Sequence, residues 1–225
     1  MNLNCLFLDF DSYFASVEQA LNPRLWNQPI AIIPMRAETT VCIAASYEAK
    51  AFGVKTGTAV GEARRLCPGI HLVLARPAMY VEFHHQMVKA VNSCLPVTEV
   101  ASVDEMACQL TGRWRDEAAA VKLAYQVKRA VAQVAAIGCS IGIGPNRFLA
   151  KMASKLDKPN GLRVIHQEQA CESLKHLDLE DLTGIAGNMR TRLERVGITT
   201  VETLYQAKRR TLRQVWGGIE GERFH

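Results

Sequence analysis

The chain has 225 residues, of which 48% are hydrophobic and 22% charged, a balance typical of a soluble globular protein with a sizeable core. No apolar run reaches the roughly 18 residues that a membrane helix needs, and no basic segment precedes an apolar one at the N-terminus, so we expect neither a membrane span nor a signal peptide. The net charge of +5 permits a polyanionic partner without demanding one.

Seven cysteines are scattered through the chain, and no two of them form a C-x-x-C pair. This spacing argues against a zinc site and against a disulfide framework. We therefore expect a reducing, cytoplasmic compartment.

The chain begins with an apolar, strand-like run over residues 6–8 that changes to helical spacing after two acidic residues, Asp9 and Asp11. Asp11 or Ser12 is predicted to cap this helix, because a short side-chain oxygen accepts hydrogen bonds from the first free amides. Asp9 then lies where a buried strand ends, and a carboxylate there is costly unless a partner such as a metal ion pairs with it. The alternative is that both acids are only turn and capping residues.

The next part of the chain predicts short strands that alternate with helices. The strands are expected at 30–33, 40–44 and 71–74, and the helices at 46–52, 62–66 and about 78–95.

Residues 99–110 alternate like a strand, but two adjacent acids, Asp104 and Glu105, interrupt the pattern. On a strand these two side chains would point to opposite faces, so both could approach one ion only at a strand end, bulge or turn. If this strand lies beside the one that ends at Asp9, three carboxylates meet, and such a group repels itself unless cations such as Mg²⁺ fill it. Two ions could then hold the attacking and leaving oxygens of a phosphoryl transfer. Taken singly, each acid could equally be an exposed turn residue.

A long Ala-rich helix is predicted over 116–136, followed by a strand at 139–144, a helix at 145–155 and a strand at 162–165. Gly142 and Gly144 precede a helix, but Arg147 stands where a dinucleotide fingerprint needs its third glycine, so close backbone packing is the better interpretation. Lys158 follows the helix, where it could complement the helix dipole or reach a phosphate.

Beyond residue 166 short helical pieces replace the strand–helix mixture, and we place a domain boundary there. Residues 183–215 carry seven basic side chains against two acidic ones, which equals the whole net excess. The turn at residues 184–187 could aim backbone amides at a phosphate, while a plain helical hairpin with a solvated basic face is the alternative.

Together these segments resemble the Y-family translesion DNA polymerases. The matching stretches, in the order and spacing of that family, are residues 8–18, 46–54, 102–105 and 140–161. The resemblance implies an α+β right-hand fold: a mixed, antiparallel-type palm sheet backed by helices, a small α/β fingers insertion and a helical thumb with a helix-hairpin-helix-like motif. The palm would comprise 1–10 and 77–165, the fingers 11–76 and the thumb 166–225. The family's little-finger domain is absent, so the chain would be a fragment or a naturally short protein.

The resemblance also implies a catalytic site. Asp9 and Asp104 would bind two Mg²⁺ ions, for which Mn²⁺ could substitute, and Glu105 would hold the ion nearer the primer 3′-hydroxyl. The carbonyl of Phe10 would complete the nucleotide-side ion, and Phe14 occupies the position of the steric gate that excludes a 2′-hydroxyl.

Further residues are assigned by motif match. The incoming nucleotide would contact Phe10, Tyr13, Phe14, Tyr47, Lys50 and Lys158, and the DNA backbone would contact Gly184, Ile185, Ala186, Arg190 and Arg192. Three positions depart from the family. Lys50 replaces the usual Arg and loses its bidentate fork, Ala44 replaces a hydroxyl residue, and Ala186 replaces the second glycine of the thumb turn.

The implied function is template-directed nucleotidyl transfer opposite damaged bases. The implied partners are primer–template DNA, deoxynucleoside triphosphates and a sliding clamp that would bind beyond the end of this chain; the protein would be a monomer without a membrane partner. A non-catalytic DNA-binding accessory member of the same family and a palm-like nucleotidyl cyclase are the alternatives.

Overall fold

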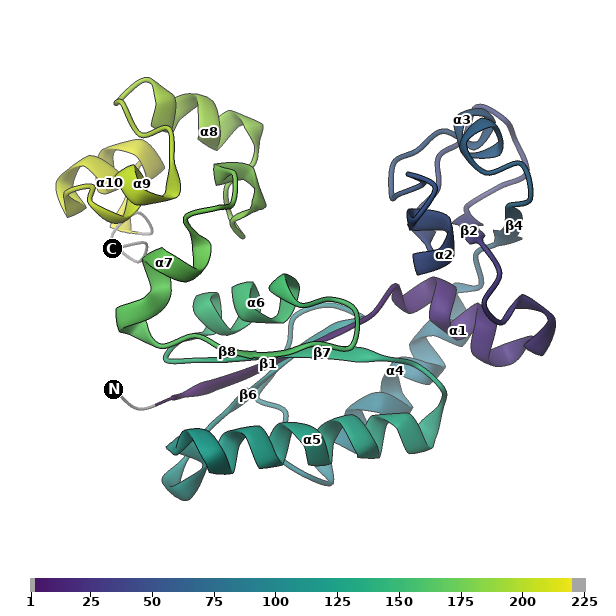
Figure 1. Cartoon of the computed structure of the whole chain (residues 1–225), viewed down its shortest axis with the longest axis horizontal. Helices are drawn as coiled ribbons and strands as arrows, with labels where there is room; N and C mark the ends of the chain where they lie inside the picture. Colours follow the sequence, from purple (N-terminus) through teal and green to yellow (C-terminus); the bar gives the residue numbers. More distant parts are fainter. Residues whose placement is uncertain (1–2, 220–225) are drawn as a thin grey trace.

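A computed structural model describes residues 3–219, in which a central sheet carries a lobe at each end (Figure 1). The sheet has the strand order β5-β6-β1-β7-β8. Its strands are β1 (Cys5–Phe10), β5 (Glu99–Val100), β6 (Glu105–Gln109), β7 (Cys139–Gly144) and β8 (Leu162–Val164). β1 is antiparallel to both of its neighbours, β6 and β7, whereas β8 is parallel to β7, so the sheet is mixed as expected.

Helices cover both faces of this sheet. α4 (Pro77–Asn92) and α5 (Glu117–Val134) lie together on one face, and α6 (Arg147–Leu156) lies on the other (Figure 1). The predicted glycine packing is confirmed, since a Cβ at Gly142 would stand 2.0 Å from the carbonyl oxygen of Ala150 in α6. Because Gly142 and Gly144 have no side chains, α6 packs directly against β7.

The first lobe follows α1 (Tyr13–Leu21) and η1 (Pro23–Leu25). It holds a small sheet of order β3-β2-β4, with β2 (Ile30–Ile33), β3 (Ala44–Ala45), β4 (His71–Leu74), α2 (Tyr47–Lys50) and α3 (Val60–Leu66). The strand expected over 40–44 is shorter than predicted, because only an isolated bridge pairs Val41 with Ala59. This lobe has its own small core of buried residues around Ala31, Val54 and Ala63.

The second lobe is helical and begins after β8, close to the boundary expected at residue 166. The lobe comprises η3 (Gln167–Gln169), α7 (Ala170–Leu174), η4 (Leu179–Asp181), α8 (Gly187–Glu194), α9 (Val201–Tyr205) and α10 (Arg209–Trp216). Outside this lobe, one further short helix, η2 (Gly112–Arg115), precedes α5. Its core is continuous with the inner face of α6. Residues 220–225, the end of the expected thumb, lie outside the described residues.

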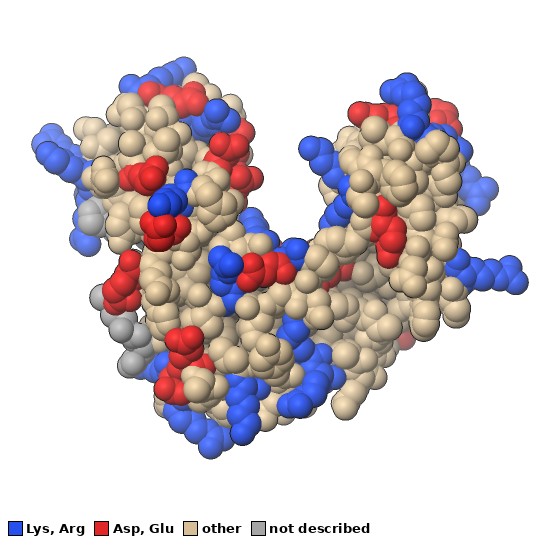
Figure 2. All heavy atoms as spheres, viewed as in Figure 1, with Lys and Arg blue, Asp and Glu red and all other residues tan. Residues whose placement is uncertain are grey.

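The fold is therefore α+β, as predicted. The space-filling view shows a deep hollow between the two lobes, with both acidic and basic side chains at its floor (Figure 2). Within residues 3–219, no helix is both long and apolar enough to cross a bilayer.

Candidate active site

Three acids lie close together where the end of β1 runs beside the start of β6. The antiparallel register sets Asp9 opposite Glu105, and the amide of Phe10 donates to the carbonyl of Asp104 at 2.9 Å. Asp104 precedes the first residue of β6, so the two adjacent acids stand at a strand end, the arrangement that lets both side chains approach one point. The hydroxyl of Ser102 donates to the Asp104 carboxylate at 2.6 Å and fixes its rotamer.

The carboxylate of Asp9 is buried, with 7% of the residue exposed. Burial raises its pKa to about 6, with the negative charges of Glu105 and Asp104 adding to the effect and the ammonium of Lys158 opposing it. The negative charges of Glu105 and Asp104 therefore make this strand edge a place where nearby positive charge is favoured.

Two of these acids, Asp9 and Glu105, form ion pairs with lysines. Lys158 forms an ion pair with Asp9, and the ammonium of Lys151 lies 2.7 Å from the carboxylate of Glu105. Lys151 was not predicted, because its role depends on α6 lying across β1 and β7, which no local pattern reveals. In residues 3–219 as placed, no three acidic, histidine or cysteine side chains converge in a metal-holding geometry.

The donor set nevertheless fits Mg²⁺. The available donors are carboxylate oxygens, which are hard ligands, and Mg²⁺ is typically bound through one or two carboxylates together with phosphate oxygens. The lysine pairs with Asp9 and Glu105 mark where positive charge is favoured. Asp9, Asp104 and Glu105 would hold such ions.

A second group of side chains faces the acids from α2 and the loop after α6. The Tyr47 hydroxyl lies 3.5 Å from Asp11, and the ammonium of Lys50 lies 2.8 Å from the Ser12 hydroxyl and 4.4 Å from the centre of the Tyr47 ring. The ammonium of Lys158 is 4.0 Å from Asp11. Burial raises the pKa of Tyr47, so its hydroxyl remains a donor. The structure thus brings Tyr47, Lys50 and Lys158 together around Asp11 and Ser12.

Phe14 lies on the first turn of α1, and its ring stacks on that of Tyr80 at 4.4 Å between centroids. Tyr13, which was also predicted to contact the nucleotide, has its side chain in the core. Only 3% of Tyr13 is exposed, and its hydroxyl donates to the carbonyl of Tyr80 at 2.7 Å inside the core. At this position only the backbone amide is left for a ligand.

A buried network that sequence reasoning missed supports the Phe14 ring. Glu18, 2% exposed, accepts hydrogen bonds from both the guanidinium of Arg76 and the hydroxyl of Tyr80, the latter at 2.9 Å. Glu18 sits within an otherwise apolar helix face, and a charged residue on such a face was the one available signal.

The prediction that the side chain of Asp11 or Ser12 caps α1 is wrong. The residue before the helix is Ser12, with φ of +48°, and no side chain caps the first turn. The left-handed turn directs Asp11 away from its own helix, and the carboxylate instead accepts from the Ser140 hydroxyl at 2.9 Å and from the amide of Asn160 at 2.7 Å. Asp11 therefore joins α1 to the loop that carries Lys158.

The comparison with known protein families decides the relationship. The sequence profile of the impB/mucB/samB family matches residues 8–155, a span that includes all three acids. The chain belongs to the impB/mucB/samB family.

Two curated proteins that are similar to this chain are both named DNA polymerase IV. DNA polymerase IV of Pelotomaculum thermopropionicum is 32% identical over 219 residues, covering 96% of this chain and 54% of that protein. DNA polymerase IV of Saccharolobus solfataricus is 32% identical over 203 residues, covering 88% of this chain and 58% of that protein. The chain spans about half the length of the curated relatives it matches.

Solved structures show the same fold. An insertion ternary complex of Dbh DNA polymerase superposes with a TM-score of 0.86 at 28% identity, covering 98% of this chain and 65% of that one. DinB from Sulfolobus solfataricus superposes with a TM-score of 0.83, also at 28% identity and with the same coverage. The chain therefore has the fold of Y-family polymerases.

The residues predicted to contact DNA lie in the helical lobe and differ in their exposure and in their ion pairs. Gly184 adopts φ of +95° in an exposed turn, but the side chain of Ile185 is buried in the lobe's core. Arg190 is held in ion pairs with Glu194 at 2.9 Å and Glu180 at 3.2 Å. The other two, Ala186 and Arg192, are exposed, so exposed backbone and Arg192 remain available to a polyanion.

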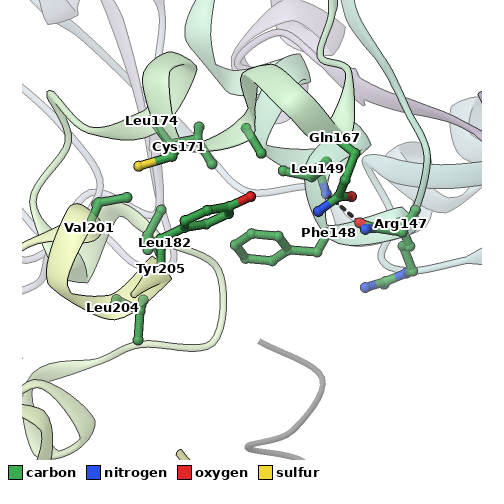
Figure 3. A pocket seen from close by; sticks show the side chains of 12 residues that line it. Arg147, Phe148, Leu149, Gln167, Cys171, Leu174, Leu182, Val201, Leu204 and Tyr205 are labelled. Atoms are coloured by element: carbon green, nitrogen blue, oxygen red, sulfur yellow. Dashed lines mark hydrogen bonds between the residues drawn. The ribbon is translucent and has the colours of Figure 1, made fainter. Parts of the chain in front are cut away.

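One well-formed pocket, of about 320 Å³, lies between α6 and the helices α7 and α9, away from the acids (Figure 3). Its lining is mainly apolar and includes Phe148, Leu149, Leu174, Leu204 and Tyr205. Its lining includes neither the three acids nor Tyr47, Lys50 and Lys158.

Proposed function

We propose that this chain is the catalytic part of a translesion DNA polymerase, which adds deoxynucleotides to a primer 3′ end under the direction of a template. The observation that carries the proposal is the register of β1 and β6, which sets Asp9 opposite Glu105, with Asp104 adjacent in the chain. A non-catalytic accessory member would not need these acids, and all three are present.

The roles of the acids follow from their positions. Asp9 and Asp104 would hold both Mg²⁺ ions, Glu105 the one nearer the primer, and the backbone carbonyl of Phe10 would complete the other. Bound Mg²⁺ ions would lower the pKa of the 3′-hydroxyl and stabilise the charge that develops on the leaving pyrophosphate. The ammonium of Lys151, 2.7 Å from the Glu105 carboxylate, would hold this side chain in place.

The remaining side chains bind and orient the nucleotide. Tyr47, Lys50 and Lys158 would contact the triphosphate, as a hydroxyl donor and two ammonium groups suited to phosphate oxygens. Phe14, fixed flat on Tyr80, would lie under the sugar and exclude a 2′-hydroxyl. Catalysis would then consist mainly of positioning and charge neutralisation.

The same proposal divides the chain into a palm (1–10 and 77–165), fingers (11–76) and a thumb (166–225). Primer–template DNA would lie in the hollow between fingers and thumb, with Gly184, Ile185 and Ala186 offering backbone amides and Arg192 a guanidinium. Recruitment by a sliding clamp, a monomeric state and a cytoplasmic location belong to the same proposal.

Primer extension tests the function. The chain, alone and fused to a family little-finger domain, should extend a primer in the presence of Mg²⁺, and Asp104→Ala should reduce extension by about 10³-fold or more, because it removes an ion ligand. Binding to primer–template DNA should change by less than about twofold, because the variant keeps every phosphate contact.

Ser102→Ala is the matched control, because it removes the 2.6 Å hydrogen bond to Asp104 while leaving the carboxylate in place. It should reduce extension far less than Asp104→Ala does. If neither form of the wild-type protein extends a primer, the proposed function is wrong.

A further inference from the structure

The half-buried side chain of Lys128, on α5, reaches the backbone of the loop that carries Lys158. Its ammonium donates to three backbone carbonyls, those of Cys139 at 2.7 Å, Asn160 at 2.8 Å and Gly161 at 3.0 Å. An ammonium has three donors, and all three are used here. Burial lowers the pKa of Lys128, a cost that these three contacts offset.

The amide side of the same loop is held by a second pair of residues. The amide of Asn160 donates to Asp11 at 2.7 Å, and the amide of Gly161 donates to the Ser140 hydroxyl at 3.1 Å. The Ser140 hydroxyl in turn donates to Asp11 at 2.9 Å. Both Asp11 and Ser140 are at least 95% buried, so this relay is shielded from water.

The loop is tightly packed at Gly161, where no side chain would fit. A Cβ on Gly161 would stand 2.3 Å from the carbonyl oxygen of Asp157, and Asn160 adopts φ of +55°. The carbonyls of Asn160 and Gly161 are therefore held by Lys128, and their amides by Asp11 and Ser140. Lys158, two residues earlier, is directed at Asp9.

We propose that Lys128, Asp11 and Ser140 form a clamp that holds the 157–161 loop and so positions the ammonium of Lys158 for the incoming triphosphate. The clamp residues are positioning residues, because they act through Lys158. This assignment rests on the proposed function for its kinetic consequence, but the clamp itself is a structural statement that can be measured separately.

The reason for a clamp lies in the competition for Lys158. In the structure this ammonium pairs with Asp9, which the proposed function requires as an ion ligand, so substrate binding must transfer Lys158 from a carboxylate to a phosphate. A loop fixed at both its carbonyls and its amides limits that transfer to a change of side-chain rotamer. A loose loop would add the entropic cost of ordering its backbone to each nucleotide bound.

The first test measures the loop directly by hydrogen exchange at the amides of Asn160 and Gly161. Lys128→Met keeps the length of the side chain but removes its three donors, and Ser140→Ala removes the relay with a smaller change in case the first variant does not fold. Each should accelerate exchange at these amides by at least about tenfold, as expected for one lost buried hydrogen bond or more. Lys122→Met, an exposed lysine on the same helix, is the matched control and should leave both amides unchanged.

The second test separates positioning from general stability. In single-nucleotide insertion, Lys128→Met should raise the KM for the deoxynucleotide by about tenfold with a smaller effect on kcat. In a Lys158→Gln background the same change should raise KM by less than about twofold, because the group through which the clamp acts is gone.

Equal effects of Lys128→Met in the two backgrounds would overturn the proposal, as would unchanged exchange at Asn160 and Gly161. If the wild type inserts no nucleotide, the proposed function fails, and the exchange measurement still decides whether the clamp holds the loop.

Discussion

Replacing Asp9 with asparagine should stabilise the metal-free protein at neutral and alkaline pH, although it should abolish the proposed activity. The burial of this carboxylate raises its pKa from the ordinary 3.8 to about 6. A carboxyl group with a raised pKa contributes stability that is fully present below pH 3.8 and is lost as the pH rises through about 6. Above pH 6 the ionised Asp9 therefore destabilises the folded state.

The magnitude follows from the two pKa values. The difference between 3.8 and about 6 corresponds to about 3 kcal/mol of unfolding free energy, at about 1.4 kcal/mol per tenfold change in proton affinity. Asparagine also deprives Lys158 of its partner, and that ammonium is about a quarter exposed, so its loss is partly compensated by water. We expect Asp9→Asn to gain about 1–2 kcal/mol at pH 8 and close to nothing at pH 5.

The assay is urea unfolding of both proteins in a chelating buffer, at several values between pH 5 and pH 8. The gain from Asp9→Asn should grow with pH over this range, and Mg²⁺ should stabilise the wild type but not the variant. A gain that is independent of pH, or a loss of stability at pH 8, would refute the burial argument for Asp9.

Three further predictions concern other parts of the site and fold. Phe14→Ala should raise ribonucleotide insertion relative to deoxyribonucleotide by at least about tenfold, because the ring stacked on Tyr80 is removed; an unchanged sugar preference in insertion assays would contradict the gate assignment. Lys50→Arg should lower the KM for the nucleotide by about three- to tenfold, since a guanidinium can contact phosphate through two N–H groups; an unchanged or higher KM would count against Lys50 as a triphosphate ligand. Gly142→Ala should destabilise the fold by about 3 kcal/mol or more, because its Cβ would stand 2.0 Å from the Ala150 carbonyl oxygen; a loss below about 1 kcal/mol in urea unfolding would show that α6 can move away from β7.

The acids could be predicted from the sequence because each one interrupts a strongly patterned segment. Asp9 ends an apolar run and Glu105 begins one, so the strand ends were visible before the pairing was known. The sequence alone did not show that the strand of Asp9 pairs with the strand of Glu105. Register depends on which strands become neighbours, and that is settled by packing over the whole sheet.

The error at Asp11 has a local cause. An acid just before a helix usually caps it, and nothing in the sequence reports that Ser12 would adopt a positive φ and turn the carboxylate toward Asn160. That contact spans 149 residues of sequence, and the pattern of a single segment carries no information about it.

The same limit explains why the role of Lys151 and the contact between Glu18 and Arg76 were not predicted from the sequence. In the sequence Lys151 looks like an ordinary surface lysine of an amphipathic helix. Its pairing with Glu105 becomes visible only when the position of α6 is known. Glu18 and Arg76 come from separate segments and meet only once α1 packs against α4. The sequence thus supplied the residue types and strand ends, while the partners of each charge came from the tertiary fold.

Template-directed insertion of a single nucleotide tests the central claim most directly. The claim predicts that the protein, given a primer–template and Mg²⁺, inserts the nucleotide complementary to the template base in preference to the other three, and that Glu105→Gln, which loses an ion ligand at the strand end, is inactive. Insertion that ignores the template base, or full activity without Glu105, would contradict it.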